Sequence, residues 1–116
     1  MPVSMSKRRF EELVGDALDL LPSELTDAMS NVVILVNDRD PDNPNLLGLY
    51  TGVSLTRRTN EYSGYLPDTI QIFREPLMAM CSTEEQLRRE VAVTVLHEVG
   101  HHFGIDDQWL HDNGWG

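Results

Sequence analysis

Two histidines and a glutamate lie close together near the end of the sequence, in the stretch HEVGHHFGIDD at 97–107. On an α-helix, His97 and His101 share one face because they are four residues, about one turn, apart. Glu98 comes three residues before His101 and leans to the same side. Two imidazoles and a carboxylate at this spacing can bind one zinc ion and leave the glutamate beside a metal-bound water.

A third ligand is expected downstream, because a catalytic zinc site uses three protein ligands and one open position. Gly104 can adopt the positive φ that ends a helix, so the chain can turn back towards the metal there. No glutamate follows Glu98 in the sequence. The remaining candidates are Asp106, Asp107, His111 and Asp112, of which Asp107 completes the spacing H-E-x-x-H-x-x-G-x-x-D.

The chemistry expected of this motif is hydrolysis of a peptide bond. Zinc lowers the pKa of its bound water to about 7. Glu98 is expected to take the proton of that water as the general base and to pass it to the leaving amine. The alternative is that His97 and His101 are ordinary histidines on a helix surface.

Length and composition limit the number of domains, the kinds of partner and the cellular compartment that can be expected. The chain of 116 residues is long enough for one domain, so we expect a single domain over 1–116. A net charge of −10 argues against nucleic acids and anionic membranes as partners. Cys81 is the only cysteine, and neither a signal peptide nor a membrane span is evident, so the sequence predicts a cytoplasmic protein.

The hydrophobic pattern predicts an α+β fold with a small sheet. Apolar residues at helical spacing indicate a covering helix over 6–21 and a short helical turn over 23–29. Strands are predicted at Val32–Val36, Leu47–Tyr50 and Thr69–Phe73, the first as a central strand that is buried on both faces. Ile70 and Ile72 alternate with more polar neighbours in the third strand.

A long helix is predicted from Thr83 to Phe103, and it carries the histidine motif across the centre of the domain. Its start matches a capping box formed either by Ser82 with Glu85 or by Thr83 with Gln86. One further helical turn is expected in the short tail after Gly104.

Several segments of the sequence are similar to the zincin superfamily, and more narrowly to a family of short bacterial proteins described as minimal zincin-like metallopeptidases. The matching pieces are GLYTGVSLTRR, YSGYLPDTIQIFREPL, LRREVAVTVLHEVGHHFGIDD and LHDNGW, which cover most of the chain after Asn45. The resemblance implies a reduced zincin fold, in which a helix and a small mixed sheet pack on the active-site helix. It also implies Zn²⁺ as the cofactor, with His97, His101 and Asp107 as ligands and Glu98 as general base. The chain departs from the metzincin pattern, since no methionine follows Met80.

For several other side chains the sequence gives weaker evidence of a functional role. His102 points away from His97 on the helical wheel and is expected on the surface or next to the metal ligands. His111 is expected to be a surface residue, although it could bind a developing oxyanion. Tyr62 and Tyr65 lie in a turn-rich loop that could reach the cleft. Trp109 and Trp115 are expected to pack the tail onto the core, and Cys81 to fill a small apolar space.

A peptide or protein is the expected substrate. We expect Thr69–Phe73 to pair with it as an extended strand, although Leu47–Tyr50 would serve equally well. The alternative function is a non-catalytic zinc-binding domain that regulates or binds a partner protein. A buried metal without an open coordination position would favour that alternative, and a metal in an accessible cleft would favour the enzyme.

Overall fold

The computed structural model describes residues 2–29, 31–52 and 67–113. The elements follow the order α1 (Lys7–Asp19), α2 (Ser23–Ala28), β1 (Val32–Asn37), β2 (Gly48–Thr51), β3 (Asp68–Phe73), α3 (Arg74–Met80), α4 (Glu84–His102) and α5 (Asp107–Asp112). Mixed α+β architecture with a small mixed sheet confirms the predicted fold class. Within these ranges, no helix combines the length and the apolar character needed to cross a membrane.

The three strands form a sheet in the order β1-β3-β2, with β1 parallel and β2 antiparallel to the central β3. The prediction that Val32–Val36 is a central strand buried on both faces is wrong, because β1 lies at an edge. Val33 and Leu35 are 41% and 44% exposed. In the described part of the chain, helices cover only one face of the sheet, and the apolar side chains of β1 on the other face remain partly exposed to water.

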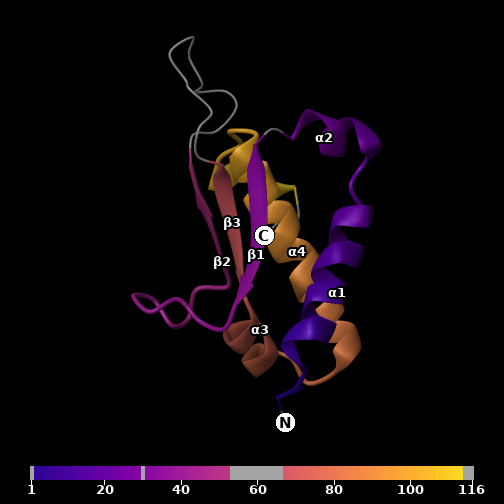
Figure 1. Ribbon diagram of the computed structural model, residues 1–116, viewed down its shortest axis with the longest axis vertical. Helices are drawn as coiled ribbons and strands as arrows, with labels where there is room; N and C mark the ends of the chain where they lie inside the picture. Colours follow the sequence, from indigo (N-terminus) through magenta and orange to yellow (C-terminus); the bar gives the residue numbers. More distant parts are fainter. Residues whose placement is uncertain (1, 30, 53–66, 114–116) are drawn as a thin grey trace.

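Helices α1 and α4 run side by side along that covered face (Figure 1). Their apolar side chains meet Ile70 and Ile72 of β3, which are completely buried, as the alternation in the sequence predicted. Phe73, the last residue of the strand, is also buried. The core consists mainly of residues from these three elements: Phe10, Leu13 and Val14 of α1, Ile70 and Ile72 of β3, and Leu87, Val91, Val95 and Val99 of α4.

Side-chain caps begin the two long helices, and the cap of α4 is one of the two alternatives that the sequence predicted. The hydroxyl of Ser6 accepts a hydrogen bond from the backbone N–H of Arg9, and Thr83 does the same for Gln86. Helix α3 is not among the predicted elements, since Pro76 follows the predicted strand Thr69–Phe73 and a proline commonly bounds a strand. The proline lies in the first turn of α3, where its missing N–H is not needed by the helix.

A buried polar cluster ties α4 to the sheet. Nδ1 of His102 lies 3.2 Å from Oδ2 of Asp68 on β3, and Tyr50 of β2 donates its hydroxyl to the same carboxylate oxygen. The side chains of His102 and Asp68 are both buried. His102 is therefore not on the surface, one of its two predicted locations; it holds the last turn of α4 against two strands.

We expect His102→Ala to lower the free energy of unfolding by about 3 kcal/mol, since removing one partner of a buried polar pair leaves the other uncompensated. Urea denaturation in the presence of a chelator measures this without any contribution from bound metal. Arg89→Ala is the control, because Arg89 is exposed on the same helix and its loss should cost less than about 0.5 kcal/mol. Equal losses for the two variants would show that the buried cluster does not hold the helix to the sheet.

Candidate metal centre

Helix α4 ends immediately after the second histidine of the motif. Gly104 has φ +81°, its N–H bonds to the carbonyl of His101, and the N–H of Ile105 bonds to the carbonyl of Gly100. These two bonds form a Schellman motif, which requires a residue with positive φ and therefore favours glycine. The predicted helix stop at Gly104 is confirmed, and the chain reverses direction there.

The reversed chain starts the short helix α5 beside the histidines. Asp106 caps this helix by accepting a hydrogen bond of 2.9 Å from the backbone N–H of Trp109. Leu110 is completely buried and anchors α5, while Trp109 is 47% exposed, so the prediction that Trp109 packs the tail onto the core is wrong. With Asp106 used as the cap, Asp107 becomes the first helical residue and lies next to the motif.

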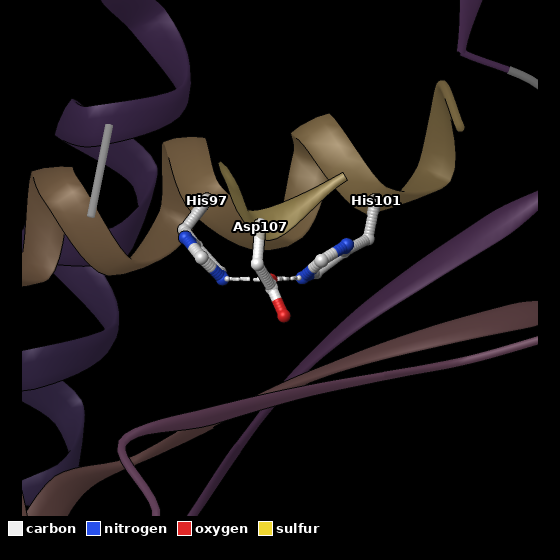
Figure 2. A group of neighbouring side chains, drawn as sticks. All are labelled: His97, His101 and Asp107. Carbon is white, nitrogen blue, oxygen red and sulfur yellow. Dashed lines mark hydrogen bonds and ion pairs between the residues drawn. The ribbon is translucent and has the colours of Figure 1, made fainter. Parts of the chain in front are cut away.

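Three ligand atoms converge at this point, from His97 and His101 on α4 and from Asp107 on α5 (Figure 2). The two Nε2 atoms are 3.1 Å apart. Oδ1 of Asp107 lies 3.1 Å from Nε2 of His97 and 2.9 Å from Nε2 of His101. Among the described residues, this is the one group of three or more histidine, cysteine or acidic side chains arranged closely enough to hold a metal ion.

The donor set and its spacing fit zinc. Imidazole nitrogen and carboxylate oxygen are common zinc ligands, and bonds of about 2.0 Å in a tetrahedron place neighbouring ligand atoms about 3.3 Å apart. The three observed separations are close to that value. Small adjustments of the side chains would therefore admit the ion.

The group of ligand atoms is open to solvent on one side. The side chains of His97 and His101 are 24% and 27% exposed, and that of Asp107 is 78% exposed. A pocket of about 670 Å³ contains all three, together with Glu98 and residues of β2. A metal held here would have room for a further, non-protein ligand.

Comparison with known proteins agrees with this geometry. The family model described as zincin-like metallopeptidase matches residues 29–115, which is most of the chain. The chain belongs to this family of zincin-like proteins. The resemblance that the motif suggested is thereby confirmed.

One solved structure extends the comparison to the fold of this zincin-like chain. It is described as a "Conserved hypothetical protein" from "Thermo thermophilus" and superposes with a TM-score of 0.56 at 19% identity. The match covers 93% of this chain and 99% of the other, so the likeness in fold extends over nearly the whole of both. No curated protein matches this chain significantly.

Glu98 is buried next to the three ligand atoms of the zincin-like site. Burial raises the pKa of its carboxyl group, and the nearby charge of Asp107 adds to the rise. His101, His97 and the backbone N–H of Tyr50, which donates to this carboxylate, lower the pKa without cancelling the effect of burial. A carboxylate that is partly desolvated in this way is a better proton acceptor near neutral pH than an exposed one.

Close contact between β2 and α4 brings the backbone of Tyr50 to Glu98. A Cβ atom at Gly48 would lie only 2.9 Å from Cγ2 of Thr94 and 3.1 Å from Cγ of Glu98, so the approach requires glycine at this point. This contact was not predicted from the sequence. A glycine at the start of a short strand was the available signal, but it does not identify the element that comes close.

The remaining predicted residues lie apart from these three side chains or outside the described residues. His111 and Asp112 are exposed on α5 and are not part of the group. Cys81 is buried, as expected of a small apolar residue. Tyr62, Tyr65 and Trp115 lie outside the described residues.

Two neighbouring aspartates allow a sharp test of the third ligand. We expect Asp107→Ala to weaken zinc binding more than tenfold, because one of three ligand atoms is lost. Asp106→Ala should change zinc affinity only a few-fold and should instead cost about 1 kcal/mol of stability through the loss of the helix cap. Competition with a chromogenic chelator measures the affinities and urea denaturation the stability. Loss of zinc in Asp106→Ala and full affinity in Asp107→Ala would contradict the assignment.

Proposed function

We propose that the protein is a zinc-dependent metallopeptidase that uses Glu98 as its general base. The observation that carries this proposal is the combination of three converging ligand atoms, open to solvent, with a buried carboxylate beside them. Membership of the zincin-like metallopeptidase family supports the same reaction class. The substrate is then a peptide or a protein.

Each site residue has a distinct task in this proposal. His97, His101 and Asp107 would hold the zinc, which supplies Lewis acidity that polarises a carbonyl group and acidifies water. Glu98 accepts a proton from the attacking water at its carboxylate and donates it to the amine that leaves. The backbone N–H of Tyr50 orients the carboxylate during both transfers.

Strand β2 is the element placed to bind an extended substrate. The expectation that Thr69–Phe73 does so is wrong, because β3 lies between β1 and β2 and both of its edges are already paired. In the described part of the chain, no strand pairs with the outer edge of β2, and this strand lines the same pocket as His97 and Glu98. Backbone hydrogen bonds to β2 would align a peptide with the metal.

The accessibility of the site favours an enzyme over a non-catalytic zinc domain. A structural zinc site normally has four protein ligands and no open position. Among the described residues only three ligand groups meet here, and Asp107 is largely exposed. A closed site would not need a buried carboxylate next to its ligands.

We also propose that the protein works in the cytoplasm. A sequence with one cysteine cannot form an internal disulfide, and Cys81 is buried as a free thiol. This cysteine usage is typical of proteins from reducing compartments.

We expect Glu98→Gln to reduce peptide hydrolysis by at least about a hundredfold while the zinc content stays near one ion per chain. Glutamine is similar in size but cannot accept the proton. Mass spectrometry of peptide mixtures measures cleavage, and elemental analysis measures zinc. Glu85→Gln, an exposed substitution in the first turn of the same helix, is the matched control and should retain full activity.

Two outcomes would contradict the proposal. Hydrolysis by Glu98→Gln at the parent rate would exclude Glu98 as the base. A zinc-loaded parent protein that cleaves no peptide in a diverse mixture would favour the non-catalytic alternative.

A further inference from the structure

A second pocket adjoins the candidate metal centre and continues along α4 towards the start of the helix. It has a volume of about 430 Å³ and shares Gly48, His97 and Glu98 with the site. From there it extends to Glu90, two helical turns before His97. Two turns correspond to about 10 Å, so a side chain whose backbone lies beside His97 must be long to reach the far end.

The side walls of this pocket are mainly apolar. Leu46 and Leu47 of the segment before β2 form one wall together with Asn43 and Asn45, and Val93 of α4 contributes to the other. The two leucines and Val93 are only partly buried, so a ligand can still cover them. The hydroxyl of Thr94 bonds to the carbonyl of Glu90 at 2.8 Å, which directs this polar group into the helix. Such walls suit a chain of methylene groups.

Glu90 places a negative charge at the far end. Helical side chains lean towards the start of their helix, so its carboxylate points further away from His97. Apart from the residues of the metal centre, Glu90 is the one charged residue among the described residues that line the pocket. Its side chain is partly buried, so water screens an ion pair there less than at a fully exposed site.

We propose that this pocket binds the lysine or arginine side chain of a peptide substrate, on a residue directly beside the bond that is cleaved. The methylene groups pack between the leucines and Val93, and the cationic head meets Glu90, as long basic side chains commonly do at apolar surfaces with a polar end. The net charge of −10 attracts cationic peptides and repels acidic ones. This inference rests on the proposed peptidase function and specifies its substrate class.

The first experiment profiles cleavage of a diverse peptide mixture by the zinc-loaded protein. Lysine and arginine should be enriched at least tenfold at one position next to the cleaved bonds. The enrichment should disappear in Glu90→Gln and shift towards acidic residues in Glu90→Lys. Glu84→Gln removes the same charge from an exposed position at the start of α4 and should keep the parent profile.

Two results of this experiment would overturn the inference and leave the peptidase function intact. One is cleavage without any preference for basic residues. The other is a basic preference that persists unchanged in Glu90→Gln.

If no peptide is cleaved, the proposed peptidase function fails, and a binding measurement then tests the inference about the pocket separately. Fluorescence anisotropy compares two labelled peptides that differ at one residue, lysine or norleucine, and therefore only in the terminal ammonium group. The zinc-loaded protein should bind the lysine peptide at least tenfold more tightly, and Glu90→Gln should abolish the difference while Glu84→Gln keeps it. Equal affinities for the two peptides would overturn the inference.

Discussion

The candidate site depends on holding two imidazole nitrogens and a carboxylate oxygen about 3 Å from one another. The helix alone supplies the two imidazoles, since His97 and His101 are one turn apart. The carboxylate of Asp107 lies beside them only because the chain reverses at Gly104 and starts a new helix at Asp107. The left-handed conformation of one glycine and the burial of Leu110 therefore hold the carboxylate of Asp107 next to the two histidines.

A second constraint positions Glu98, the proposed base. Glu98 is useful only if its carboxylate is partly removed from water and held in one orientation, and β2 provides both conditions by its close approach to α4 at Gly48. The cluster of Tyr50, Asp68 and His102 fastens the same strand to the last turn of α4. Residues outside the proposed ligand set thus hold together the helix that carries His97 and His101 and the strand that lies beside Glu98.

Local features of the site could be predicted because they follow from short-range rules. Residue spacing placed His97 and His101 on one face, and the preference of glycine for positive φ placed the end of the helix. The role of Asp107 as the nearest carboxylate followed from its spacing and the family resemblance, and the structure brings it to the histidines. Whether these atoms bind zinc remains a proposal.

Features that depend on distant parts of the chain could not be predicted. The order of the strands was not predicted. An uninterrupted apolar run such as Val32–Val36 can form either a central strand or an edge strand, so the sequence pattern does not distinguish the two positions. The helical wheel showed that His102 points away from the metal, but it could not show that Asp68, 34 residues earlier, lies there to pair with it. Helix α3 was missed because a proline is compatible both with the end of a strand and with the first turn of a helix.

The central claim is that His97, His101 and Asp107 hold one zinc ion in an accessible site. X-ray absorption at the zinc edge tests it most directly, on protein loaded with one equivalent of the metal. We expect nitrogen and oxygen ligands alone, at about 2.0–2.2 Å, with outer-shell scattering from two imidazoles and a coordination number of about four to five. A sulfur ligand at about 2.3 Å, or a shell of oxygen atoms without imidazole, would contradict the account.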